Sequence, residues 1–237
     1  MRATLLISLL FIVTVAQSET KMPATPLIAH SANYEASITK GIELNGKAIR
    51  SLSEREDGTW LYNFNVDTLP ATINENSVFS IEADGIAPIS YEYKLAGMLI
   101  KNRHQSVNFD RSNGKIIEHY KKNAWELDSQ GLVLDRLNYQ LMLQMDVAAG
   151  KTEMSYSVVH KGEIREYEFA TVGSETIKTK VGERKALLVE KVREGNSKRE
   201  TKLWFDSQAP YLLLRMIQTE SDGERYEINI TKENTSS

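Results

Sequence analysis

The chain has 237 residues, of which 41% are hydrophobic and 26% are charged, and its formal net charge at pH 7 is −3. The absence of cysteine excludes disulfides, cysteine-ligated metal clusters and thiol catalysis, and the composition excludes a disordered chain and a polytopic membrane protein. The small net charge gives no electrostatic reason to expect a nucleic-acid partner.

The N-terminus has the pattern of a secretory signal over residues 1–18. Arg2 supplies the positive start, an uncharged run follows from Leu5 to Ala16, and Ala16-Gln17-Ser18 is a small-x-small cleavage site. The run is shorter than the roughly 20 residues that span a bilayer, so we expect cleavage and no transmembrane segment afterwards. The sequence therefore predicts export. A periplasmic location is favoured over secretion or retention by an uncleaved N-terminal anchor.

The part that follows the leader divides into three segments. Residues 19–32 hold Pro23 and Pro26 among small and polar residues without periodicity, which predicts an N-terminal tether. We expect a single antiparallel β domain over 33–232 and a disordered tail over 233–237. A domain of this length can bury a core without a covalent crosslink.

The domain reads as strands separated by tight turns. Apolar and aromatic side chains recur at every second position, for example at Trp60, Tyr62, Phe64 and Val66. The turns are indicated by pairs rich in Gly, Asn and Asp, which tolerate positive φ: Asn45-Gly46, Asp57-Gly58, Asp84-Gly85, Asn113-Gly114, Lys161-Gly162, Gly195-Asn196 and Asp222-Gly223. Eleven strands and a final hairpin are predicted over about 33–43, 46–56, 59–68, 76–82, 87–96, 101–110, 114–121, 152–160, 163–172, 185–193, 199–206, 211–220 and 224–232.

Residues 136–149 break this pattern and predict a helix. Leu137, Leu141, Met145 and Ala148 are spaced 4, 4 and 3 apart, which places them on one stripe. Asp135 precedes them as an N-cap, and Gly150 stands where a left-handed residue ends a helix. The apolar stripe is widened by Met142, Leu143 and Val147, so we expect the helix to be covered on more than one side.

Residues 203–217 carry apolar side chains in both phases, which predicts strands buried on both faces, between the helix layer and the hollow of the sheet. Together the elements predict a mainly all-β fold: a curved antiparallel sheet or half-open β-barrel of about 11–13 strands with one packed helix. A transmembrane barrel fits badly, because the alternate strand face carries charged pairs such as Glu92 with Lys94.

Several stretches resemble a family of exported bacterial proteins that share a domain of unknown function. The resemblance implies an exported, mostly periplasmic, all-β domain with one helix, and it covers about 33–232. It implies no catalytic residue, cofactor or substrate. The stretches that carry it are Tyr34-Glu35-Ala36-Ser37, 137–141 (LNYQL), 162–169 (GEIREYEF), 189–193 (VEKVR), 198–205 (KRETKLWF) and 210–215 (PYLLLR).

A search for catalytic and metal-binding patterns finds none. The four histidines, His30, His104, His119 and His160, have no metal-ligand spacing, so we expect no metal and no cofactor. Serine-nucleophile motifs and glycine-rich phosphate loops are absent. Carboxylate pairs such as Glu166 and Glu168 could serve a glycosidase, but such pairs are common on solvated strands. The sequence favours a non-enzymatic role.

The aromatic residues are open to two interpretations. They could line a hollow that binds an acyl chain or another apolar ligand, or they could form the core against which the helix packs. The residues that we predict to contact such a ligand are Trp60, Tyr62, Phe64, Tyr91, Tyr93, Leu141, Met145 and Trp204.

Three functions follow from these observations. The first is an exported envelope protein that binds a lipid or acyl chain in the hollow of its curved sheet. The second is a protein–protein interaction module of the envelope with a filled core and a protein partner. The third is an envelope-polymer hydrolase, which would require two carboxylates brought together from distant strands.

Overall fold

The computed structural model describes residues 27–235 except 70, 83–84, 99 and 194. The predicted leader over 1–18 and most of the predicted tether lie outside the described residues. The predicted tether ends earlier than expected, because the first strand already begins at His30 and places Leu27 and Ile28 against the domain. At the other end, the last strand continues to Thr235, into the segment predicted as a tail.

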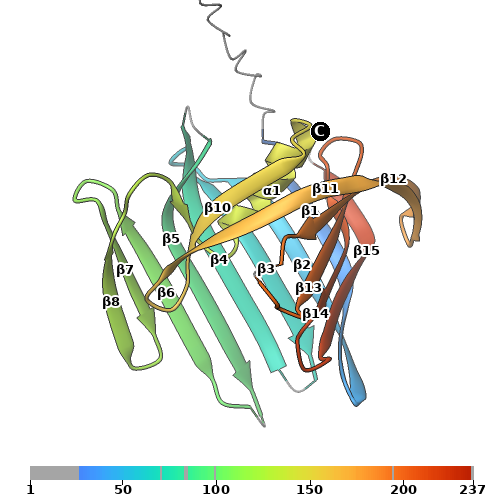
Figure 1. Ribbon diagram of the computed structural model, residues 1–237, viewed down its shortest axis with the longest axis horizontal. Coiled ribbons are helices and arrows are strands. Elements are labelled where there is room, and N and C mark those ends of the chain that lie inside the picture. Colours follow the sequence, from blue (N-terminus) through green and yellow to red (C-terminus); the bar gives the residue numbers. More distant parts are fainter. Residues whose placement is uncertain (1–26, 70, 83–84, 99, 194, 236–237) are drawn as a thin grey trace, which may run out of the picture.

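The described residues form one 15-stranded sheet and one helix (Figure 1), which confirms the predicted mainly antiparallel fold. Strands that follow one another in the chain pair antiparallel, except that β8 and β9 do not pair and that β9 and β10 pair in parallel across the helix connection. In addition, β15 pairs with β1. The bounds are β1 His30–Lys40, β2 Ile42–Glu54, β3 Trp60–Thr68, β4 Ala71–Glu82, β5 Gly85–Gly97, β6 Arg103–Asp110, β7 Lys115–Tyr120, β8 Asn123–Asp128, β9 Val133–Leu134, α1 Asn138–Ala148, β10 Glu153–Val159, β11 Ile164–Thr179, β12 Gly182–Lys191, β13 Glu200–Asp206, β14 Leu213–Thr219 and β15 Arg225–Thr235.

The sequence prediction missed β8 and β9 and was wrong about one turn. The turn between β1 and β2 is at Gly41, which has a φ of +76°, whereas Asn45-Gly46 lies inside β2. Gly46 is needed there for a different reason: a Cβ at this position would overlap the Thr68 side chain and the Asp67 carbonyl on β3. A glycine inside a strand can mark a site where another backbone approaches closely.

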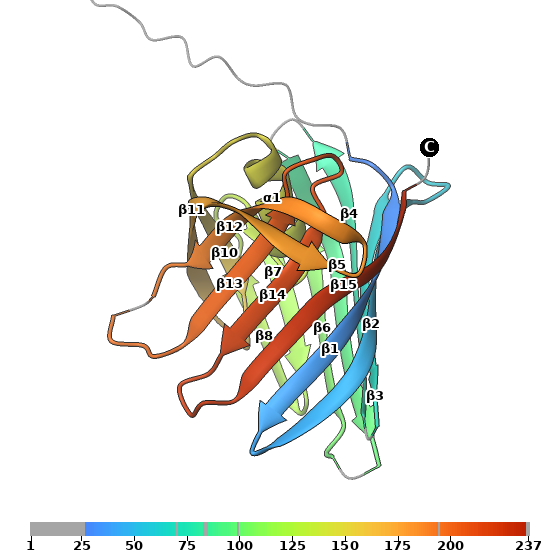
Figure 2. The same cartoon turned by 90° about the vertical axis from the view of Figure 1, so that its right-hand side faces the viewer.

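The sheet rolls up around α1 without closing. Its two end strands, β8 and β9, are not hydrogen-bonded to each other. Instead β9 packs against β5, and Figures 1 and 2 show α1 held within the curve of the sheet, toward one end. Cross-strand partners share a face, so the pairing registers identify the inner face by its buried residues, among them Leu52, Tyr62 and Tyr91.

The two ends of the roll are joined by side chains. Glu118 on β7 is fully buried and accepts hydrogen bonds from the backbone N–H groups of Lys161 (2.8 Å) and Gly162 (2.7 Å) in the β10–β11 turn. It also accepts one from Gln105 Nε2 at 2.6 Å. The turn residues have φ of 53° and 81°, and a Cβ on Gly162 would overlap the indole of Trp125 on β8. The β10–β11 turn is therefore seated on the inner face of β7 and β8.

Strand β13 is buried on both faces, as predicted, but its outer face is covered by a hairpin and not by the helix layer. The long β11–β12 hairpin folds back across β13–β15, where Lys180 pairs with Glu35 and Arg184 with Glu233 (Figure 2). Trp204 lies beneath it and donates a hydrogen bond from Nε1 to Glu175. A bulge at Thr171/Gly173 bends β11, and this bend turns the hairpin out of the plane of the sheet.

The helix α1 spans 138–148 within the predicted 136–149 and is covered on several sides. Its buried residues include Leu141, Leu143 and Val147, and it packs against β5 and β10. Asp135 precedes the first turn, and its Oδ1 accepts hydrogen bonds from the N–H groups of Leu137 and Asn138 at 2.8 and 2.7 Å. Gly150 follows the helix with a φ of +79°, so both predicted end signals are confirmed.

Candidate functional site

Four inner-face residues on adjacent strands form a row at the N-terminal side of α1. Arg50 on β2 pairs with Phe64 on β3, Phe64 with Glu75 on β4, and Glu75 with Tyr93 on β5. Arg50 and Glu75 are buried, whereas Phe64 and Tyr93 are half-buried. In the next inner row, further from α1, Ala48 and Val66 are still buried, whereas Ile73 and Leu95 are half-buried.

Arg50 is held by neutral partners. Its Nη1 donates to the Tyr62 hydroxyl at 3.1 Å and its Nη2 to Gln140 Oε1 at 2.6 Å, while its guanidinium lies 4.6 Å from the centroid of the Phe64 ring. Its Nε is buried without a hydrogen-bond partner. Burial alone lowers the pKa of Arg50, but the nearby Tyr62 and Tyr34 hydroxyls and the Glu75 carboxylate raise it on balance. The guanidinium is therefore charged at physiological pH.

Arg136 supplies a second cation at the other end of the row. It stacks on Tyr93, with 5.8 Å from its guanidinium carbon to the ring centroid. Burial lowers the pKa of Arg136, and the negative potential of Tyr91 and Glu75 outweighs that effect. Glu75 itself accepts a hydrogen bond from the Tyr91 hydroxyl at 3.1 Å. One carboxylate thus lies between two guanidinium groups.

Asp135 is a second carboxylate in this region, and burial raises its pKa to about 6. Its Oδ2 accepts a hydrogen bond from Ser77 at 2.6 Å, and its Oδ1 caps the helix. Both oxygens are committed to the fold and the residue is fully buried. Asp135 and Glu75 therefore do not form the accessible carboxylate pair that a glycosidase needs.

Aromatic rings continue the site from α1 to β11. Tyr139, on the first turn of α1, meets Tyr167 edge-on at 5.3 Å between centroids and stacks on Phe169 at 5.8 Å. Lys191 Nζ lies 3.5 Å from the centroid of the Tyr167 ring. Burial, together with the positive charges of Arg136, Lys161, Arg165 and Arg199, lowers the pKa of His160 to about 4. Four cationic side chains therefore act on His160 on this side of the hollow.

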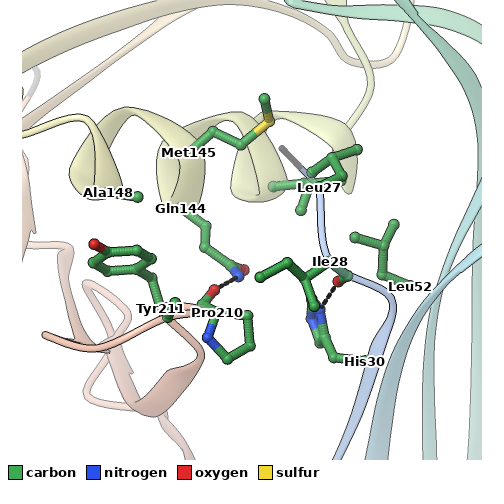
Figure 3. Close-up of a pocket in the computed structure, with 11 residues that line it drawn as sticks. Leu27, Ile28, His30, Leu52, Gln144, Met145, Ala148, Pro210 and Tyr211 are labelled. Atoms are coloured by element: carbon green, nitrogen blue, oxygen red, sulfur yellow. Dashed lines mark hydrogen bonds between the residues drawn. The ribbon is translucent and has the colours of Figure 1, made fainter. Parts of the chain in front are cut away.

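A separate apolar pocket lies beside α1 (Figure 3). Leu27 and Ile28 cover the helix face that carries Leu141 and Met145, and Gln144 Nε2 donates to the Pro210 carbonyl at 2.8 Å. His30 closes the pocket, with its Nδ1 2.8 Å from the Ile28 carbonyl, and burial lowers its pKa. The cavity volume is only about 30 Å³, which is room for one water molecule and not for an acyl chain.

The structure separates the eight predicted ligand residues into four groups. Tyr62 and Tyr91 beside α1, and Leu141 on α1 itself, are fully buried core residues. Trp60, Phe64 and Tyr93 are half-buried on the inner face, and Met145 lines the small pocket. Trp204 lies on the outer face beneath the β11–β12 hairpin. Whether any of them contacts a ligand stays a prediction.

Sequence reasoning missed Arg50, Glu75, Arg136 and Tyr139 as parts of one site. Two weak signals point to them. Arg50 has the phase of the buried Ala48 and Leu52, and Arg136 follows the helix cap directly. Among the described residues, no group of three or more His, Asp or Glu side chains could hold a metal ion.

These features define the class of protein as an open, barrel-like β domain with a helix inside its curve. Residues 33–231 match the family described as DUF3108, a protein of unknown function, and the chain belongs to that family. The resemblance to a family with a domain of unknown function is thereby confirmed, and export of this chain stays a prediction.

Comparison with one solved structure supports the fold. The chain is similar to a β-barrel-like protein of domain of unknown function DUF1849 from Brucella abortus, with a TM-score of 0.60 and 12% identity over 90% of this chain and 100% of that one. A second structure, the MucA/MucB complex of Pseudomonas aeruginosa, has a TM-score of 0.29 and 10% identity over 88% of this chain and 52% of that one. A search of curated proteins found no match.

In the part of the chain that the structure describes, no helix has the length and hydrophobicity needed to cross a membrane.

Proposed function

We propose that the protein is a non-enzymatic, exported envelope protein that binds an apolar chain, such as a lipid acyl chain, on the inner face of its rolled sheet. The observation that carries this proposal is the change in burial along the inner face. Near α1 the inner side chains Tyr62, Phe79 and Tyr91 are fully buried, whereas further along the same strands Phe64, Ile73 and Tyr93 are only half-buried.

An apolar strip that is half covered within a concave surface favours an apolar occupant. Each methylene group that leaves water contributes about 0.8 kcal/mol, so a chain of modest length along the strip binds usefully. Met216 on β14 and Leu95 on β5 continue the half-buried apolar surface on the two sides of the hollow. The helix fills one end of the roll and leaves the strip at the other end.

The proposal is tested by introducing a charge into the strip. Ile73→Lys places an ammonium group on the inner face, whereas Ile49→Lys places one at an exposed outer position of β2 and serves as the matched control. We expect Ile73→Lys to lower the affinity for a fluorescent fatty acid at least tenfold and Ile49→Lys to change it less than twofold. Equal affinities for both variants, with circular dichroism showing both folded, would contradict the proposal.

A second candidate, the interaction module with a filled core, is favoured by a different observation. The apolar pocket beside α1 has a volume of only about 30 Å³. Tyr62, Tyr91 and Leu141 are fully buried in the core. Native mass spectrometry of protein purified from the periplasm separates the candidates. A co-purified lipid supports the binding protein, whereas lipid-free protein that crosslinks in cells to one reproducible partner supports the module.

A further inference from the structure

A second concave region lies at the ends of β11, β12 and β13, outside the row described above. It is a pocket of about 200 Å³, and four of its lining side chains are cations: Arg165, Lys191, Arg193 and Arg199. Tyr167 and Thr201 contribute hydroxyl groups to the same lining. No carboxylate is among the lining residues within the described part of the chain.

The arginines of this cationic pocket are anchored by acids that lie outside it. Arg165 pairs with Glu163 at 2.7 Å, Arg193 with Glu200, and Arg199 with Glu220 at 3.3 Å. Each guanidinium carries five N–H donors, so a guanidinium that is oriented by a carboxylate can still donate to a further acceptor. These arginine side chains are about half exposed, which leaves them accessible from the pocket.

Two lining residues of the cationic pocket lie on the inner face of the sheet. Arg165 pairs across strands with Val158 and Tyr167 with Tyr156, and both partners are buried on the inner face. The Tyr167 ring therefore faces inward, and it meets Tyr139 on α1 edge-on. A molecule that lies along the apolar strip can thus present one end to the cations.

We propose that this pocket binds the phosphate group of an amphipathic ligand whose apolar chain occupies the hollow. This rests on the proposed function for the chain, while the pocket itself is assigned from its own residues. The pocket offers three guanidinium groups and one ammonium group. A phosphate ligand suits these donors better than a carboxylate ligand, because phosphate carries more charge and more acceptor oxygens. Hydroxyl groups of Tyr167 and Thr201 are suited to the remaining oxygens.

The test uses the full mature chain and isothermal titration with three probes at concentrations below micelle formation. The probes are lysophosphatidylglycerol, a monoacylglycerol with the same acyl chain, and inorganic phosphate. We expect the phosphate-bearing lipid to bind at least tenfold more tightly than the monoacylglycerol, with an affinity that falls as salt is raised. The double variant Arg193→Gln/Arg199→Gln should remove this preference and leave monoacylglycerol binding unchanged.

Lys178→Gln, at an exposed position of β11 outside the pocket, is the matched control and should retain the preference. Equal binding of the two lipids to the unaltered protein would overturn the pocket and leave the proposed function standing. Binding of inorganic phosphate that the double variant abolishes, without binding of either lipid, would support the pocket as a site for free phosphate and overturn the proposed function. Retention of the preference by the double variant would overturn the assignment to these residues.

Discussion

Glu118→Gln is expected to loosen the contact that joins the two ends of the rolled sheet. The carboxylate accepts three hydrogen bonds, from Lys161 N, Gly162 N and Gln105 Nε2, at 2.6 to 2.8 Å, and it is fully buried. An amide of the same shape has one acceptor oxygen, so its NH₂ group must face one of these donors.

The magnitude follows from the groups that lose their partners. One charge-assisted hydrogen bond is lost, at about 1.5–3 kcal/mol, and one N–H is left buried and unsatisfied, at about 1–3 kcal/mol. We expect the free energy of unfolding to fall by about 3–5 kcal/mol. For a domain of this size that corresponds to a decrease in Tm of about 6–20 °C.

Urea unfolding followed by circular dichroism measures the loss, and hydrogen exchange measures the protection of the Lys161 and Gly162 amides. Glu126→Gln on β8 is the matched control, because Glu126 is exposed and pairs with Lys115 at the surface. We expect the control to retain the stability of the unaltered protein. A loss no larger than that of the control, or unprotected Lys161 and Gly162 amides before any substitution, would refute the side-chain closure.

Three further predictions concern the fold. Because burial raises the pKa of Asp135 to about 6 from 3.8, its carboxyl group favours the folded state in its protonated form, and about 3 kcal/mol of stability is lost as the pH rises from about 4 to about 6. Asp135→Asn keeps an oxygen that can cap the helix, and it should abolish this pH dependence of the free energy of unfolding, measured by urea unfolding between about pH 4 and 6. An unchanged pH dependence would assign the effect to another group. Gly46→Ala should lower the Tm by several degrees, whereas Gly173→Ala, where a Cβ meets nothing within 4 Å, should not, and equal Tm values would contradict the close packing at Gly46. Trp204→Phe loses the hydrogen bond to Glu175 and should lower stability by about 1 kcal/mol without changing fatty-acid affinity; weaker binding would place Trp204 in the ligand site.

The strands, their turns and the helix could be predicted because each leaves a local signal. Alternation along β3 and the cap at Asp135 are set by neighbours in sequence. Strand β8 was missed because it is a short strand of six residues at the edge of the sheet. Its side chains are exposed or half-buried, so burial imposes only a weak alternation of apolar and polar residues. The site depends on tertiary register: Arg50, Glu75 and Arg136 come from β2, β4 and the segment before α1, and nothing local to any of them indicates the other two.

The burial of Trp204 is a second feature that the sequence predicts only in part. Its phase differs from that of Leu203 and Phe205, so the sequence indicates a strand buried on two faces, but it does not indicate what covers the second face. The covering hairpin is contributed by β11 and β12, and its contacts with Glu35 and Glu233 bridge strands from both ends of the chain. Such a contact depends on the completed roll.

The seam at Glu118 has a consequence for the width of the lumen. In a barrel closed by backbone hydrogen bonds, strand number and stagger fix the diameter, and widening it requires breaking a ladder. Here no ladder spans the seam, so the circumference is set by one carboxylate, two turn amides and an indole. Other residues at these positions would therefore allow the same strands to roll to a different diameter.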